Sequence, residues 1–233
     1  MRERSLVLTR PAIRTLTAAI DVVLLTPREQ TLAVLLLRAD PRARDRWVLP
    51  WDAPRVDEPP DDAAARVARS VLGTGPAALE QIGAFGDSRR HPGDAQLSIA
   101  FVGLVPHDVS SAATDAVAWV ELPNLPALAP RHRAMVEASV EAVRRRLDQS
   151  PLAFRLLPPA FTLSELQGIY ELLLGRRLHK ASFRRALQAA FLVEPIDEWR
   201  SEGRGRPAQL YRYAPRRRRV GKRGVRFDLL SVD

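Results

Sequence analysis

The chain has no cysteine among its 233 residues and only four histidines. The lack of cysteine excludes disulfides, thiolate nucleophiles and thiolate metal ligands. The histidines lack the paired spacing of a zinc site, so we expect ordinary surface or partly buried residues at His91, His107, His132 and His179. No stretch approaches 18 uninterrupted apolar residues, which argues against a membrane span. The first 14 residues are charged and lack the apolar core of a signal peptide, so we expect a cytoplasmic protein.

The net charge of +9 is carried by the last third of the chain. Residues 1–150 hold 19 basic and 19 acidic side chains, whereas residues 151–233 hold 17 basic and 8 acidic ones. This asymmetry predicts a polyanionic partner for the C-terminal part. The tail at 216–233 supplies seven of those 17 basic residues, so a solvated basic tail explains most of the excess. Such a tail either adds non-specific affinity for phosphates or does nothing measurable.

Strand and helix patterns alternate in the first 150 residues. Short apolar runs predict strands at 16–25, 31–37, 95–105 and 116–122. Apolar residues at three-and-four spacing predict helices at 61–72 and 131–147. We expect Asp61 or Asp62 to cap the first helix and Gly73 and Gly75 to end it. This order predicts an α+β fold, with a mixed sheet sandwiched by helices.

The pattern changes after a predicted domain joint at residues 148–152. Thr162 and Glu165 form a capping box that begins a helix over 163–174. A short turn leads to a second helix over about 179–191, which has apolar residues on one side and basic and polar residues on the other.

Two strand patterns follow, at 193–196 and 209–213, and between them lies an Arg-Gly-rich loop at 201–207. A helix, a turn, a basic helix and a β-hairpin are the sequence form of a winged helix-turn-helix. We therefore expect two domains, 1–150 and 151–215, followed by the basic tail.

The segment from Leu49 to Gly75 contains the most informative motif. It resembles a Nudix box, which reads Gly, five residues, Glu, seven residues, then Arg-Glu-hydrophobic-x-Glu-Glu-x-Gly. Glu58, Arg66 and Gly73 occupy the first Glu, the Arg and the last Gly. Asp52 replaces the leading Gly, and the other three glutamates are replaced by Val67, Ser70 and Val71.

In an active Nudix hydrolase, the box glutamates hold Mg²⁺ or Mn²⁺ against a pyrophosphate. Hard cations need several oxygen ligands, and of the box glutamates only Glu58 remains. The resemblance therefore implies a degenerate Nudix domain with no catalytic residue, no metal ligand and no cofactor.

The segment from Gln81 to Pro106 resembles the region after the box in the Nudix-related transcriptional regulators. Phe85, Gly86 and Pro92 fit that pattern, as does Arg90. Arginine suits bidentate contact with phosphate, so the candidate ligand-binding residues are Arg89, Arg90, Glu58 and Arg66. An exposed basic turn at Arg89 and Arg90 is the alternative.

Three C-terminal segments, 161–170, 180–185 and 205–212, resemble the winged helix of the same regulators in the same order. Residues early in the second helix are expected to face the major groove: Lys180, Ser182, Arg184 and Arg185. Arg204 and Arg206, at the hairpin tip, are expected to reach phosphates or the minor groove.

The resemblance covers residues 15 to 213. It implies a DNA-binding transcriptional regulator whose inactive Nudix domain senses a nucleotide-sugar metabolite such as ADP-ribose, from NAD metabolism. It also implies a homodimer on double-stranded operator DNA. Two alternatives stay open: an ADP-ribose or nucleotide-sugar pyrophosphatase with atypical metal ligands, and a scaffold whose winged helix binds protein.

Overall fold

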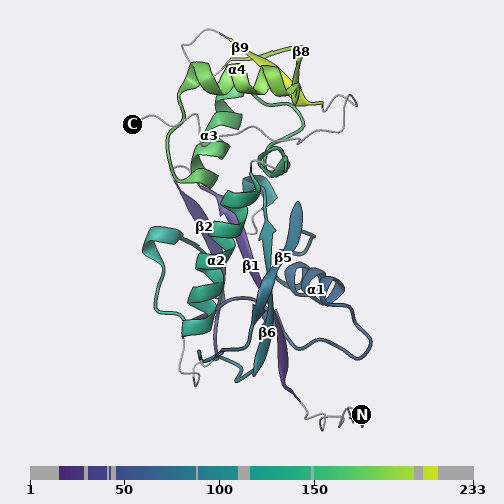
Figure 1. Cartoon of the computed structure of the whole chain (residues 1–233), viewed down its shortest axis with the longest axis vertical. Helices are drawn as coiled ribbons and strands as arrows, with labels where there is room; N and C mark the ends of the chain where they lie inside the picture. The colour runs from purple at the N-terminus through teal and green to yellow at the C-terminus, as the bar shows by residue number, and fades with distance from the viewer. Residues whose placement is uncertain are drawn as a thin grey trace, which may run out of the picture.

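The computed structural model describes residues 16–28, 31–40, 42, 46–87, 89–109, 116–147, 150–201 and 207–214. A mixed sheet forms the lower part in Figure 1, and a smaller helical unit with a hairpin forms the upper part. The sheet strands are β1 (Ala18–Pro27), β2 (Leu32–Arg38), β3 (Trp47–Val48), β4 (Trp51–Asp52), β5 (Ala78–Phe85), β6 (Leu97–Leu104) and β7 (Val117–Glu121).

The order of the sheet is β3-β2-β1-β6-β5, with β4 paired to β1 and β7 to β2. The β1–β6 pair is parallel and the other pairs are antiparallel. The four strands expected from apolar runs are therefore confirmed, close to their expected bounds. Strand β5 was not expected, because its sequence ALEQIGAF mixes polar residues and glycine with apolar ones and leaves only half-buried and exposed side chains.

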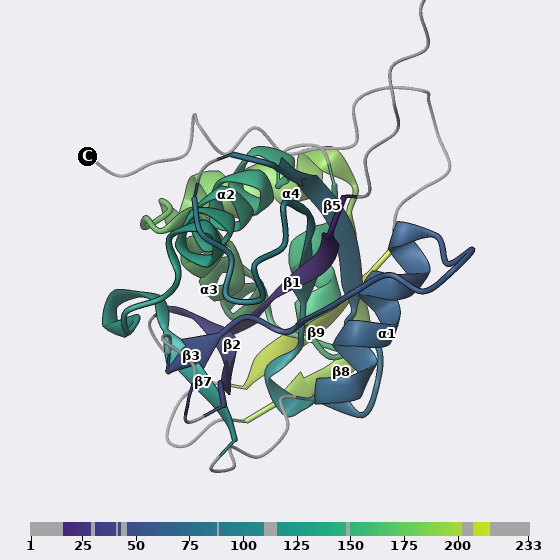
Figure 2. The ribbon, with the colours of Figure 1, turned by 90° about the horizontal axis from the view of Figure 1, so that it is seen from below.

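Two helices cover opposite faces of this sheet (Figures 1 and 2): α1 (Pro60–Leu72) and α2 (Pro130–Arg146). Helix α1 begins after Pro59 with no side-chain cap. The expected cap by Asp61 or Asp62 is wrong, because Pro60 takes the first helical position and moves both carboxylates into the first turn, where they favour the helix dipole. The helix ends at Gly73, whose φ of 72° is left-handed, as expected.

The side chains of β1 alternate between the two faces of the sheet. Val23 and Leu25 belong to the core under α2, whereas Val22 and Leu24 belong to the core under α1. Because side chains alternate along a strand, Asp21 shares the α2 face with Val23. A carboxylate thus lies in the middle of a buried strand.

The C-terminal unit is a winged helix, as expected. It consists of the 3-10 turn η3 (Leu152–Leu156), helices α3 (Leu163–Leu174) and α4 (Lys180–Ala190), and the hairpin β8 (Val193–Arg200) and β9 (Ala208–Tyr213). Two further 3-10 turns lie in the sheet domain, η1 (His107–Val109) and η2 (Leu122–Asn124). The capping box is present: Thr162 Oγ1 accepts from the Glu165 N–H at 3.1 Å, and a Glu165 carboxylate oxygen accepts from the Thr162 N–H at 2.6 Å.

The winged helix packs directly on the sheet domain. One hydrophobic core runs from the α2 face of the sheet into the upper unit, where it includes Phe154, Tyr170 and Phe183. Polar contacts reinforce the junction: Arg155 donates to the Ala77 carbonyl at 2.9 Å, and Arg144 donates to a carbonyl at the end of α3 at 3.4 Å. In the described part of the chain, no helix combines the length and the hydropathy needed to cross a bilayer.

Candidate functional site

Arg66 organises what remains of the box. Its Nε and Nη2 donate to the two carboxylate oxygens of Glu58 at 2.7 and 2.8 Å. Its Nη1 donates to Asp52 at 2.5 Å, and Nη2 also donates to the Ala53 carbonyl at 3.1 Å. A guanidinium has five N–H groups, so four of them bind the loop that precedes α1.

Both carboxylates of this cluster are committed to the protein. Glu58 also accepts from the backbone N–H of Arg55 at 2.9 Å, and Asp52 accepts from the N–H of Ala53 at 2.9 Å. The hydrogen bonds from Arg66 and from the Arg55 backbone lower the pKa of Glu58 to about 2. The bond to Glu58, and then the bond to Asp52, raise the pKa of Arg66. Glu58 and Arg66 therefore stay charged and paired across the physiological range.

The Nudix fold implies a divalent metal at this place, and the residues present do not fit one. Val67 and Val71 offer no ligand atom, and the hydroxyl of Ser70 donates to the Val67 carbonyl within its own helix at 2.8 Å. The two oxygens of Glu58 accept from Arg66. A hard cation would have to displace the hydrogen bonds from Arg66 to gain Glu58 or Asp52, so no metal-dependent chemistry follows from this donor set.

A cavity of about 260 Å³ lies where the box would hold its metal. It is lined by Leu37, Pro50, Trp51, Asp52, Arg55, Arg66, Val67, Ser70 and Val71. Val67 and Val71 thus form an apolar wall, and two arginines, one carboxylate and Ser70 form the polar part. A cavity that combines apolar walls with a few polar groups can hold a small molecule.

The expected ligand-binding residues do not gather in one place. Glu58 and Arg66 belong to the box cluster, whereas Arg89 and Arg90 lie on the loop after β5 and do not line the cavity. Arg89 is exposed and pairs with Asp87 at 2.9 Å. Arg90 is half-buried, and its carbonyl accepts from the backbone N–H of Arg131 at 3.3 Å.

Trp51 contacts both the cavity and the loop after β5. It lines the cavity, and its ring lies edge-on against the His91 ring with centroids 4.9 Å apart. A Cβ added to Gly93 would lie 2.2 Å from the Trp51 ring, so only glycine allows this close approach. The loop that carries Arg89 and Arg90 is therefore packed against one wall of the cavity.

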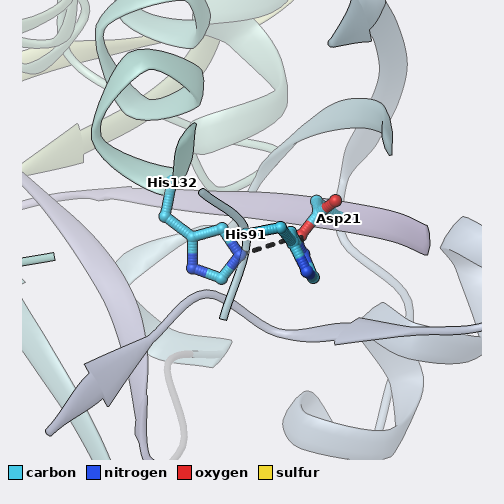
Figure 3. Close-up of side chains that lie close together, drawn as sticks. All are labelled: Asp21, His91 and His132. Atoms are coloured by element: carbon cyan, nitrogen blue, oxygen red, sulfur yellow. Dashed lines mark hydrogen bonds and ion pairs between the residues drawn. The ribbon is translucent and has the colours of Figure 1, made fainter. Parts of the chain in front are cut away.

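A buried polar cluster holds the same loop from the other side (Figure 3). Nε2 of His91 and Nε2 of His132 lie 2.9 and 3.0 Å from the same carboxylate oxygen of Asp21. All three side chains are fully buried. The expectation of surface or partly buried histidines is thus wrong for these two, because β1 places an acid beneath them. No local sequence pattern indicates this cluster, since the two histidines lie 70 and 111 positions from Asp21.

The ligand atoms of this cluster lie within 4.8 Å of one another, a spacing that a metal ion would accept. The hydrogen bonds of the two Nδ1 atoms argue against a bound metal. Nδ1 of His132 accepts from the Leu49 N–H at 3.1 Å, and Nδ1 of His91 accepts from the Gly93 N–H at 3.0 Å. A backbone N–H can only donate, so each ring carries its proton on Nε2 and donates it to Asp21. A histidine bound to a metal through Nε2 needs the opposite arrangement.

The cluster fixes the ionisation of Asp21 and the position of the loop. Burial raises the pKa of Asp21, but the hydrogen bonds from His132 and His91 outweigh it and lower the pKa to about 2. Next to His132, Arg131 donates to the carbonyls of Ala95 at 2.6 Å and Asp87 at 2.9 Å. The start of α2 thus binds both ends of the loop 87–95.

Helix α4 exposes the side that carries the predicted DNA-binding residues. Lys180, Arg184 and Arg185 are exposed, and Ser182 is half-buried. Phe183 and Leu187 are buried against α3 and the hairpin, which fixes the helix with its basic side outward. Arg204 and Arg206 lie outside the described residues.

The hairpin beside α4 is anchored by Arg200. Its guanidinium donates to Glu165 at 2.6 Å and to the Ala160 carbonyl at 3.2 Å. Phe161 adds a backbone bridge to Tyr211 on β9. The wing therefore has a fixed base next to the basic helix, the arrangement by which winged helices dock on a duplex.

Comparisons with known proteins agree with this geometry. Residues 153–213 match the family model of the NrtR DNA-binding winged helix domain. The ADPR responsive transcriptional repressor NtrR of Acinetobacter baylyi is 28% identical over 203 residues, which cover 84% of this chain and 81% of the relative.

Solved structures extend the similarity to the whole fold. The crystal structure of Shewanella oneidensis NrtR complexed with a 27mer DNA is 28% identical, with a TM-score of 0.75, and the match covers 85% of this chain and 94% of that chain. A MutT/nudix family protein from Enterococcus faecalis shares the fold at 18% identity and a TM-score of 0.69, over 86% of this chain and 89% of that one. Over most of its length the chain is therefore similar to the Nudix-related transcriptional regulators, and residues 153–213 match their DNA-binding winged helix domain.

Proposed function

We propose that this protein is a DNA-binding transcriptional regulator that senses a nucleotide-sugar metabolite of the ADP-ribose type. One observation carries the proposal: a Nudix box without its metal ligands is packed on a winged helix whose second helix exposes a basic side. A box without its metal ligands fits binding of a nucleotide sugar without cleavage. A winged helix with an exposed basic helix fits binding of duplex DNA. The name of the Acinetobacter baylyi relative, which calls that protein ADPR responsive, supports ADP-ribose as the first effector to test.

We assign DNA binding to residues 151–215 and effector binding to residues 1–150. In the DNA-binding part, the major-groove contacts fall to Lys180, Ser182, Arg184 and Arg185, because these residues lie at and after the start of α4. Arg204 and Arg206 would bind phosphates or the minor groove from the wing. The basic tail at 216–233 would add non-specific affinity.

In the effector-binding part, Arg89 and Arg90 are the proposed contacts outside the box cavity. Glu58 and Arg66 would act mainly on the shape of the site, since four of the five N–H groups of Arg66 already bind the loop before α1. A homodimer would place two α4 helices about one turn of DNA apart, on a palindromic operator. A regulator of this kind works where the DNA is, which for a bacterial cell is the cytoplasm.

We further propose that the protein does not hydrolyse ADP-ribose. The support is the donor set, in which valines and a serine replace three carboxylates. The test is incubation of the full chain with ADP-ribose and Mg²⁺ or Mn²⁺, followed by chromatography of the products. Release of AMP above the level of a protein-free control would favour the alternative, a pyrophosphatase with atypical ligands.

DNA binding is tested separately by a mobility shift with the intergenic DNA next to the gene. We expect a shift by the wild type and its loss in the Arg184→Ala/Arg185→Ala variant. Arg133→Ala, which removes an exposed arginine of α2, is the matched control and should shift normally. No shift by the wild type at low salt, on any neighbouring intergenic DNA, would favour a protein-binding scaffold instead.

A further inference from the structure

The box cavity contains a cation that the box pattern does not predict. Arg55 lines the cavity, and its side chain is exposed. Its guanidinium forms no hydrogen bond or ion pair with any residue that the structure describes, although its charge attracts Glu58. Arg66 differs, since all but one of its N–H groups are used within the protein. Of the two cavity arginines, Arg55 therefore has its donors available for a ligand.

The position of Arg55 is fixed by its backbone. Its N–H donates to a Glu58 carboxylate oxygen at 2.9 Å, and its carbonyl accepts from the Glu58 N–H at 3.2 Å. These two bonds close a tight turn that includes Asp57 in a left-handed conformation, with φ of 58°. Arg66 holds Glu58 from the other side. The surviving box residues thus place the backbone of Arg55 at the cavity, which gives them a use independent of metal binding.

The rest of the cavity suits the organic part of a nucleotide. Val67 and Val71 form one wall, and Trp51 brings an aromatic ring. The volume of about 260 Å³ is near the lower end of ligand sites, so the cavity holds part of a nucleotide sugar and not all of it. The cavity has room for a diphosphate beside the charged Arg55 and one ribose against Val67 and Val71.

We propose that Arg55 supplies the positive charge that a divalent metal supplies in a Nudix hydrolase, and binds the diphosphate of the effector. The guanidinium offers paired N–H groups that match phosphate oxygens. Recognition of the effector then needs no metal, and the loss of the box carboxylates removes negative charge that would repel the diphosphate. This inference rests on the proposed function, because it names how that same site recognises its ligand.

The test is calorimetric titration of the full chain with ADP-ribose, in buffer with Mg²⁺ and in buffer with EDTA. We expect the two dissociation constants to agree within twofold. Arg55→Ala should weaken binding by about 10- to 100-fold, the range for a lost hydrogen-bonded charge pair. The dissociation constant of Arg55→Lys should lie between those of the wild type and Arg55→Ala, because lysine keeps the charge and loses the paired N–H groups. Arg69→Ala removes an exposed arginine of the same region that does not line the cavity, and should bind like the wild type.

The outcomes separate the two proposals. Loss of binding in EDTA, or an Arg55→Ala variant that binds ADP-ribose within twofold of the wild type, overturns the role of Arg55 and leaves the effector proposal standing. A wild type that shifts DNA but binds no ADP-ribose overturns the effector proposal itself. Because Arg55 is exposed, its variants should keep the wild-type melting temperature, which confirms that any loss is local.

Discussion

Replacing Asp21 with asparagine tests the buried cluster that holds the loop 87–95 to the sheet. The asparagine oxygen can still accept from His91 and His132, so the substitution removes the charge and keeps the shape. The pKa of Asp21 falls from 3.8 to about 2 on folding, and each pKa unit corresponds to 1.36 kcal/mol. The ionised carboxylate therefore favours the folded state by about 2 kcal/mol over its neutral form. We expect Asp21→Asn to lower the free energy of unfolding at pH 7 by about that amount.

The sign of the pH dependence follows from the direction of the shift. A carboxyl whose pKa is depressed in the folded state stabilises the protein above its unfolded pKa, and this stability is lost as the pH falls from about 4 toward 2. The wild type should therefore lose about 2 kcal/mol more than Asp21→Asn across this window, so that the two proteins converge in acid. Other carboxyl groups titrate equally in both, and the difference isolates Asp21.

The measurement is urea denaturation followed by tryptophan fluorescence, at several pH values between 7 and the lowest at which the protein stays folded. Asp108→Asn is the control, because it changes an exposed carboxylate and should alter the unfolding free energy by less than about 0.5 kcal/mol. An Asp21→Asn variant as stable as the wild type at pH 7, or the same slope in acid for the two proteins, would refute this role of Asp21. In either case the carboxylate would not be stabilised by the two rings.

Three other changes have defined outcomes. Gly93→Ala should destabilise the protein by about 1–3 kcal/mol in a thermal melt, because the new Cβ would lie 2.2 Å from the Trp51 ring and must displace it; an unchanged melting temperature would mean that the loop yields freely. Thr162→Ala should cost about 1 kcal/mol by removing the side-chain acceptor of the α3 capping box, and equal stability in urea would show that the cap is dispensable. The Arg184→Ala/Arg185→Ala variant should reduce the slope of log K against log salt by up to about 2, measured by fluorescence anisotropy, and an unchanged slope would place both side chains away from phosphates.

The winged helix could be predicted almost completely, because its signals are local. Thr162 and Glu165 stand three positions apart at the start of an apolar stripe, and the structure forms the capping box that this spacing predicts. The loss of the box carboxylates was also visible, since a motif with fixed spacing shows which positions have changed. In both cases the residues that act together lie within one turn or one helix.

The buried Asp21 cluster and the place of Arg55 could not be predicted, because they depend on contacts between segments that are not adjacent in the sequence. Asp21 sits in an apolar run that predicts a strand, and nothing near it indicates that two histidines 70 and 111 positions away will close over it. Arg55 occupies one of the five unspecified positions of the box pattern, and its place in the cavity follows only from the turn that Glu58 and Arg66 hold. The cap of α1 was predicted wrongly because Pro60 has a stronger preference for the first helical position than Asp61 has for the cap.

We expect a nucleotide sugar to change the affinity of this protein for DNA without being cleaved. The most direct measurement is an anisotropy titration of a labelled duplex from the neighbouring intergenic DNA, with and without ADP-ribose, followed by recovery of the ligand. We predict that the duplex binds the wild type, that saturating ADP-ribose changes its dissociation constant at least fivefold, and that the ligand is recovered intact. A dissociation constant that ADP-ribose leaves unchanged, or recovery of AMP in place of ADP-ribose, would contradict the claim.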